Sequence, residues 1–192
     1  RTAGILMPDH FPPSPYGVGT LGQCARDFIQ FLHRAGQTYW QILPICPTGY
    51  GDSPYQSFSS YAGNPYMIDF DDLKKEGLLQ EEEYASISGG DNPARVDYSL
   101  LYSHKFSILR IACSRISGVL SERFQTFCKE QNVWLNDYAL YMMIKDYYDG
   151  QSAGVAGNSP EKEKDSLEAI RQELTDEILF WKKVQFLFFY QW

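Results

Sequence analysis

The side chains of this chain that could do chemistry gather in the stretch 46–65. It mixes turn-forming Gly and Pro residues with exposed-looking aromatic rings and short polar groups, namely Tyr50, Tyr55, Phe58 and Tyr61 with Asp52, Ser53, Gln56 and Asn64. A sugar ring has an apolar face and a rim of hydroxyl groups, so its site needs flat aromatic surfaces with hydrogen-bonding groups between them. The stretch therefore indicates a carbohydrate site. A long loop whose tyrosines pack onto the protein body fits the same composition equally well.

Asp52 is the single carboxylate of this stretch. An Asp between Gly51 and Ser53 is more typical of a turn than of a catalytic centre. Gln56 and Asn64 are expected to fix the loop backbone and not to touch a ligand.

Two short apolar runs and a helical pattern must position this loop. Residues 3–7 and 39–45 are predicted to be strands, the second one buried on both faces, and apolar residues at helical spacing predict a helix over 21–35 that ends at Gly36. Together they predict a βαβ unit. The loops 8–19 and 46–65 both leave the carboxyl ends of its strands, where an α/β barrel carries its active site.

The rest of the chain reads as helical. Short helices are predicted at 71–77 and near Glu81, and longer ones over 100–116, 122–129 and 133–147. A Gly- and Ser-rich loop, 150–159, precedes a helix that begins near Ser159 and whose apolar stripe runs from Leu167 towards Phe188.

Charge and cysteine content exclude several classes of function. The net charge of −7 argues against a nucleic-acid partner. The four cysteines, Cys24, Cys46, Cys113 and Cys128, have no metal-site spacing and are expected to be free and half-buried thiols. No leader or long apolar run occurs, so no membrane partner is expected and a cytoplasmic location is predicted.

The stretch from Gly49 to Ser59, GYGDSPYQSFS, followed by AGNP at 62–65, resembles the signature of the 4-alpha-glucanotransferases (amylomaltase, disproportionating enzyme, glycoside hydrolase family 77). The similarity extends back to PYGVG at 15–19 and forward through Asp69 and WL at 134–135 to FFYQW at 188–192. The chain departs from the family at 7–12, where MPDHFP replaces a His-Pro-Thr-Ser-Leu-Pro pattern. No sugar contact is therefore assigned to His10.

This resemblance implies an α/β fold: the N-terminal part of a TIM (β/α)8 barrel with an inserted, mostly helical subdomain. The expected division is 1–70 for the first βα units with the substrate loops, 71–160 for the insertion, and 161–192 for a long helix leading back to the barrel. A complete barrel needs about 250 residues, so we expect this chain to stop before the barrel closes.

The resemblance also implies a chemistry. Retaining transfer between α-1,4-glucans needs two carboxyl groups about 5–5.5 Å apart, and the family places its catalytic carboxylates beyond Trp192. No catalytic residue is therefore expected in this chain. By resemblance Tyr55, Ser53 and Asp52 bind the substrate, and Tyr50 and Tyr102 form a second glucan site. From the residues alone, Tyr102 is more typical of helix packing.

No cofactor and no metal are expected, and the expected partner is an α-1,4-glucan or maltooligosaccharide. Two other interpretations stay open at this point: an autonomous carbohydrate-binding module and an inactive interaction domain. The apolar end FLFFYQW favours the enzyme, because a closed module would cap or cover such a segment.

Overall fold

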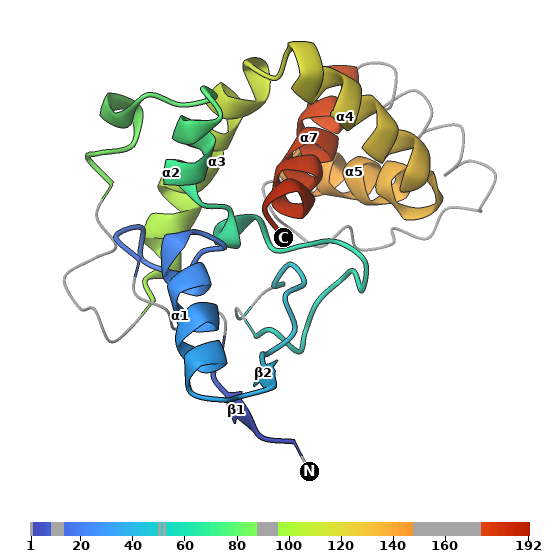
Figure 1. Cartoon of the computed structure of the whole chain (residues 1–192). Helices are drawn as coiled ribbons and strands as arrows, with labels where there is room; N and C mark the ends of the chain where they lie inside the picture. Colours follow the sequence, from blue (N-terminus) through green and yellow to red (C-terminus); the bar gives the residue numbers. More distant parts are fainter. Residues whose placement is uncertain (1, 9–13, 50, 52, 88–95, 148–173) are drawn as a thin grey trace. The chain divides into compact units, whose positions relative to one another are not determined.

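The computed structural model describes every residue except 1, 9–13, 50, 52, 88–95 and 148–173 (Figure 1). In chain order its elements are β1 Gly4–Leu6, α1 Gln23–Arg34, β2 Tyr39–Gln41, the 3-10 helix η1 Pro65–Met67, α2 Phe70–Lys75, the 3-10 helix η2 Glu81–Glu83, α3 Tyr98–Ser114, α4 Gly118–Glu130, α5 Asn132–Tyr147 and α7 Thr175–Gln191. The described part of the chain is thus mostly helical with one small sheet.

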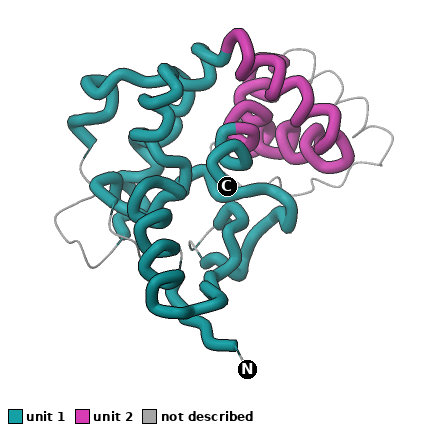
Figure 2. Tube along the Cα trace, viewed as in Figure 1, with its two compact units in different colours: residues 1–116, 187–192 teal, residues 117–186 magenta. Residues whose placement is uncertain are grey.

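Residue contacts divide the chain into two compact units (Figure 2). Unit 1 holds Arg1–Ile116 and Leu187–Trp192, and unit 2 holds Ser117–Phe186. Helix α7 therefore contributes residues to both. This division follows compactness alone, so the domain boundaries expected near 70 and 160 stay a prediction.

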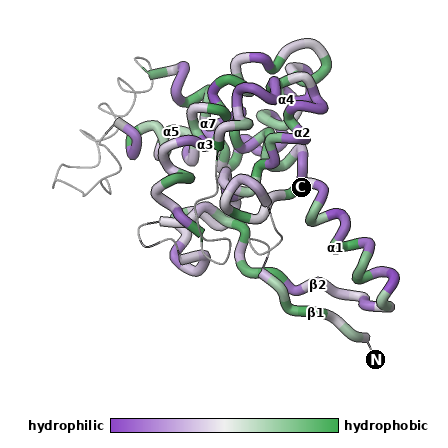
Figure 3. The backbone as a smooth tube through the Cα atoms, turned by 90° about the vertical axis from the view of Figure 1, so that its left-hand side faces the viewer, coloured by the Kyte–Doolittle hydropathy of each residue, from purple (hydrophilic) through white to green (hydrophobic). Residues whose placement is uncertain are grey.

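The expected βαβ unit is confirmed. Strands β1 and β2 pair in parallel, with Gly4 opposite Tyr39 and Leu6 opposite Gln41, and α1 connects them. The N–H of Met7 extends the ladder by donating to the carbonyl of Gln41 over 3.0 Å. Figure 3 shows the two strands side by side, with β1 coloured as a hydrophobic segment.

The expected lengths and burial of these strands are wrong. Each spans three residues, and Ile5, Leu6 and Tyr39 are 41%, 62% and 61% exposed. An apolar run indicates what a strand is able to bury, whereas actual burial depends on neighbouring elements. In the described part of the chain this sheet has two strands, so each keeps an unpaired edge.

Helix α1 follows its predicted pattern. Ala25 and Leu32 are buried, and Gly36, at φ 69°, adopts the left-handed conformation expected just beyond the helix end. Figure 3 shows polar and apolar residues alternating along α1. Phe31 departs from the pattern, because it lies on the apolar stripe and is nevertheless 56% exposed.

The helices of unit 1 begin where the sequence indicates. Asp69 caps α2 by accepting the N–H of Asp72 over 2.9 Å, and Gly77, at φ 74°, follows the helix. Asp97 caps α3 by accepting the N–H of Ser99 over 3.0 Å. The prediction of 71–77 and 100–116 is therefore confirmed to within one or two residues at each end.

The core of unit 1 lies around the start of α2. Ile68, Leu73 and Leu109 are fully buried. The ring of Phe70 packs on Tyr16 at 5.1 Å and on Tyr84 at 5.6 Å between centroids. This core joins the segment before α1, the start of α2 and the segment after η2, which lie far apart in the sequence.

Unit 2 packs α4, α5 and the first part of α7 together. Leu135, Ala139 and Met143 of α5 and Trp181 and Val184 of α7 are buried. Phe124 of α4 meets Phe186 at 5.6 Å between ring centroids. Of the predicted apolar stripe of the last helix, Ile178 and Trp181 are confirmed as buried, whereas the range 148–173, with Leu167 and the predicted start near Ser159, lies outside the described residues.

Gly22, the residue before α1, sits against the Asp69 carboxyl group so closely that an added Cβ would lie 2.0 Å from Oδ2. We predict that Gly22→Ala destabilises the protein by about 1–3 kcal/mol, the usual cost of overpacking. Urea unfolding measures the effect. The matched control is Gln23→Ala, whose side chain bonds Asp27 at the surface and whose loss should cost within about 0.5 kcal/mol. Equal stability of the two variants would show that the Asp69 carboxyl group is not fixed.

Candidate functional site

Loop 46–63, the larger part of the connection from β2 to η1, is closed at its base by Asn64. The N–H of Asn64 donates to the carbonyl of Ile45 over 2.8 Å. The Asn64 side chain accepts the N–H of Tyr66 over 3.0 Å, which caps η1. The expected structural role of Asn64 is thus confirmed. The two ends of loop 46–63 are held together by a buried residue.

Serine hydroxyl groups hold the interior of the loop. Ser53 Oγ accepts the N–H of Tyr55 over 3.3 Å, and Ser57 Oγ accepts the N–H of Ser59 over 3.2 Å. Ser59 Oγ then accepts the N–H of Ala62 over 3.1 Å. Such turns satisfy backbone groups locally, so the loop keeps a defined shape without regular secondary structure.

Two aromatic side chains of this loop are exposed, whereas Phe58 is half-buried. Tyr55 is 72% exposed and Tyr61 is 69% exposed, while Ser53 is half-buried. The sequence also allowed a loop whose tyrosines pack onto the protein body. For Tyr55 and Tyr61 that interpretation is wrong. Tyr50 and Asp52, which the sequence also places in the site, and His10 lie outside the described residues.

Tyr102 is partly exposed, as expected of a sugar-binding ring, and it also packs on a neighbouring ring, as expected of a helix residue. It lies on α3 and is 49% exposed, while its ring meets the buried Tyr66 edge-on at 5.5 Å and 87°. Tyr66 also packs on Tyr98 and Phe106. The partly exposed ring of Tyr102 thus rests on an aromatic cluster centred on Tyr66, which lies two residues after Asn64.

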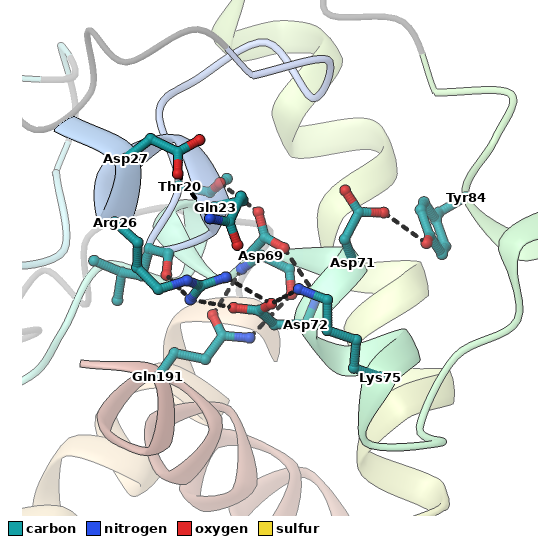
Figure 4. A network of polar contacts seen from close by, with 11 residues as sticks. Thr20, Gln23, Arg26, Asp27, Asp69, Asp71, Asp72, Lys75, Tyr84 and Gln191 are labelled. Carbon is teal, nitrogen blue, oxygen red and sulfur yellow. Dashed lines mark hydrogen bonds and ion pairs between the residues drawn. The ribbon is translucent and has the colours of Figure 1, made fainter. Parts of the chain in front are cut away.

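A buried polar network lies at the start of α2 (Figure 4). The Asp69 carboxyl group accepts the Thr20 hydroxyl over 2.6 Å as well as the N–H of Asp72. The Gln191 side chain brackets the Asp69 backbone: Oε1 accepts its N–H over 2.8 Å, and Nε2 donates to its carbonyl over 3.0 Å. Sequence reasoning missed this network. The spacing of Asp69 and Asp72, typical of a capping residue and its N3 partner, was the available signal.

Charged side chains surround this network. Arg26 donates two hydrogen bonds to Asp72, of 2.7 and 2.9 Å, and Lys75 donates a third over 2.7 Å. Burial alone would raise the pKa of Asp72, but these bonds hold that pKa below its usual value. Burial and the neighbouring Asp71 raise the pKa of Tyr84, which donates its hydroxyl to Asp71 over 2.8 Å. The carboxylates here are occupied by structural partners.

Lys105 is the buried cation of this region. Its Nζ donates to the carbonyl of Ile68 over 2.5 Å and lies 4.0 Å from the ring centroid of Phe70. The side chain lines a cavity of about 10 Å³, the size of one water molecule, with Tyr16 and His104 among its walls. Loss of solvent lowers the pKa of Lys105 to about 7, and the nearby Asp69 opposes that shift.

The described side chains of this region fall into two kinds. The described part of loop 46–63 offers rings and hydroxyl groups, and the carboxylates next to it serve as caps and ion-pair partners. Within the described ranges, no three His, Cys, Asp or Glu side chains converge where a metal ion could bind. None of the four cysteines, all of them described residues, is in a disulfide, as expected. Cys46 and Cys128 are half-buried as predicted, whereas Cys24 is exposed and Cys113 is buried. None of the described helices is long and apolar enough to cross a bilayer.

Comparison with known proteins gives a consistent result. The family model described as 4-alpha-glucanotransferase matches residues 12–192. The chain is 42% identical to a 4-alpha-glucanotransferase from Thermus thermophilus over 201 residues, covering all of this chain and 38% of the relative. It is 40% identical to one from Clostridium butyricum over 185 residues, covering 94% of this chain and 37% of the relative.

A solved structure has the same fold. The amylomaltase from Streptococcus agalactiae in complex with acarbose matches all of this chain with a TM-score of 0.90 and 34% identity, and the match covers 39% of that protein. The chain thus spans less than two fifths of the length of these relatives.

The buried Lys105 predicts a pH dependence of stability. Between its folded pKa of about 7 and its unfolded value of about 10.4, the unfolded chain binds a proton that the folded protein does not. The contribution of Lys105 to the free energy of unfolding should therefore rise with pH between these two pKa values and stay constant at lower pH. Melting temperatures of the wild type and of Lys105→Met, from about pH 7 to about pH 9, measure the difference.

We expect the difference in melting temperature to shift in favour of the wild type as the pH rises. Lys129→Met, which removes an exposed lysine of α4, reports the background change. Parallel curves for the wild type and Lys105→Met would contradict a lysine that loses its proton in the folded protein.

Proposed function

This chain belongs to the 4-alpha-glucanotransferase family, and on that premise we propose that it is the N-terminal part of an enzyme that transfers α-1,4-glucan segments between maltodextrin chains. The observation that carries the proposal is the family match over residues 12–192, which includes the whole of loop 46–63. The transfer proceeds with retention through a covalent glycosyl-enzyme. A sugar hydroxyl in place of water then accepts the glycosyl group.

The carboxylate pair that such a reaction requires lies outside these 192 residues in this proposal. Asp52 is the one Asp or Glu in the sequence of loop 46–63, and a pair about 5–5.5 Å apart is needed. The role of this chain is then to bind and orient the glucan. Orientation alone does not break a glycosidic bond, because no group supplies the nucleophile or the proton.

We propose Tyr55, Ser53 and Asp52 as the residues that bind the sugar next to the cleaved bond. Tyr55 supports this role because a ring that is 72% exposed can stack on a sugar face. The N–H of Tyr55 also donates to Ser53 Oγ, which links the backbone of the two residues. A related amylomaltase binds acarbose, which agrees with an α-glucan or maltooligosaccharide as the ligand here.

We propose that Tyr50 and Tyr102 bind a remote part of a long glucan. Tyr102 supports this role because half of its surface is exposed and its other side rests on Tyr66. A platform of this kind stabilises bound polysaccharide without touching the reacting bond. Its contribution would be absent with short donors, which do not reach it.

The fold proposal extends the βαβ unit. We propose that β1 and β2 are the first strands of a (β/α)8 barrel and that a helical subdomain is inserted after them, with boundaries near 70 and 160. The exposed Ile5, Leu6 and Tyr39 support this, because further strands and helices of a barrel would bury such side chains. A cytoplasmic location is part of the same proposal.

The first test is activity. We predict that the full-length protein converts maltotriose into glucose and longer maltodextrins, whereas residues 1–192 alone do not, because they lack the carboxylate pair. Chromatography of the products decides. Glucan binding by both proteins without transfer by either would instead indicate a binding module, and no binding by either would indicate an interaction domain. Transfer by residues 1–192 alone would assign chemistry to Asp52.

The second test separates the two sugar sites. In the full-length enzyme we predict that Tyr55→Ala lowers kcat/KM with maltotriose by about tenfold or more, because the sugar loses its alignment for attack. Tyr102→Ala should weaken turnover of amylose and leave maltotriose nearly unchanged. Steady-state kinetics with both substrates measures this. Tyr61→Ala is the matched control, since it removes a ring of similar exposure from the same loop. An equal effect of Tyr55→Ala and Tyr61→Ala would remove the special role of Tyr55.

A further inference from the structure

The last turn of α7 contacts the base of loop 46–63. Phe188 is fully buried, and its ring covers Gly63 so closely that a Cβ on Gly63 would lie 2.0 Å from Cδ1 and 2.1 Å from Cε1. Its other ring neighbours include Trp192, stacked at 6.4 Å and 14°. The ring therefore fixes the position at which the loop ends.

Gln191 holds the same segment at its other end. One side-chain amide makes two hydrogen bonds to the backbone of Asp69, of 2.8 and 3.0 Å, and so fixes both the position and the orientation of that peptide unit (Figure 4). Phe188 and Gln191 are three residues apart, so they lie on one face of the helix. A single helical turn thus contacts residue 63 and residue 69.

The segment 63–69, held at both ends, connects the two groups of proposed sugar contacts. The backbone N–H of Asn64 closes loop 46–63 through the carbonyl of Ile45, and the side chain of the same residue caps the helical turn that carries Tyr66. Tyr66 supports the ring of Tyr102 at 5.5 Å. A shift of this segment would move the loop and the Tyr102 platform together.

We propose that Phe188 and Gln191 are positioning residues for glucan binding: through segment 63–69 they fix loop 46–63, which carries Tyr55, and the support of Tyr102. The inference rests on the function proposed above, because only a glucan-transferring enzyme needs the rings of Tyr55 and Tyr102 aligned with a sugar chain. Neither residue contacts the ligand in this scheme. Their role is to remove conformational freedom from the loop before the ligand binds.

The test uses Gln191→Met in the full-length enzyme. Methionine keeps the unbranched length of the side chain and loses both hydrogen bonds to Asp69. The matched control is Gln185→Met on the same helix: Gln185 is fully buried and donates to the Tyr138 hydroxyl over 3.2 Å, within unit 2. Both substitutions remove buried amide hydrogen bonds, so a general loss of stability affects both.

Two measurements distinguish positioning from stability. Hydrogen–deuterium exchange, well below the melting temperature, reports the opening of residues 53–62, and kinetics with maltotriose reports sugar alignment. We expect Gln191→Met to speed exchange in 53–62 and to lower kcat/KM about threefold to tenfold, mostly through KM, the size of effect given by one or two lost hydrogen bonds. Gln185→Met should leave both quantities near wild type.

A second variant keeps the test decisive if Gln191→Met does not fold. Phe188→Leu keeps the site apolar but removes the ring from Gly63, and the same changes in exchange and in KM are expected. Unchanged exchange and KM in the folded variants, or equal changes in Gln185→Met, would overturn the proposal. If the wild type transfers no glucan, the proposed function fails, and the exchange of residues 53–62 still decides whether this turn of α7 holds the loop.

Discussion

The packing of unit 1 depends on the hydrogen bonds that surround the buried Asp69. Burying an ionised carboxylate is costly unless hydrogen bonds replace the water that it loses. Here the Thr20 hydroxyl and the N–H of Asp72 supply them, and Gln191 satisfies the backbone of the same residue. Three segments that are distant in the sequence must therefore come together before Asp69 can be buried. This requirement couples the start of α1, the start of α2 and the end of α7.

Lys105 of α3 is a second buried ionisable side chain next to this centre. Its ammonium group meets the carbonyl of Ile68 and the face of Phe70, the residues on either side of Asp69. The attraction of Asp69 opposes the effect of burial on the pKa of Lys105. In the described part of unit 1, a hydroxyl group, backbone groups and an aromatic ring contact these two side chains and replace part of the water that they lose.

The sequence was informative wherever the determining interactions are local. Gly77 and Gly36 marked helix ends correctly, because caps act within one turn. The signature around Tyr55 indicated the family from the residues alone. The burial of β1 and β2 could not be predicted in the same way, since Ile5 and Leu6 are apolar but have too few neighbours in the described chain to cover them. Nor could the contacts of Gln191 with Asp69, which are 122 residues apart.

The same distinction explains how the candidate site is built. Its exposed surface, with Ser53 and Tyr55, is shaped by hydrogen bonds between residues two or three apart, and these are readable in the sequence. The position of this surface relative to the rest of unit 1 is set at Gly63 and Asp69. These residues contact Phe188 and Gln191 at the end of α7. A loop with only local bonds would keep its shape but could rotate as a body about its ends. The non-local contacts oppose that rotation, and the alignment of a sugar chain proposed above would require both kinds of constraint.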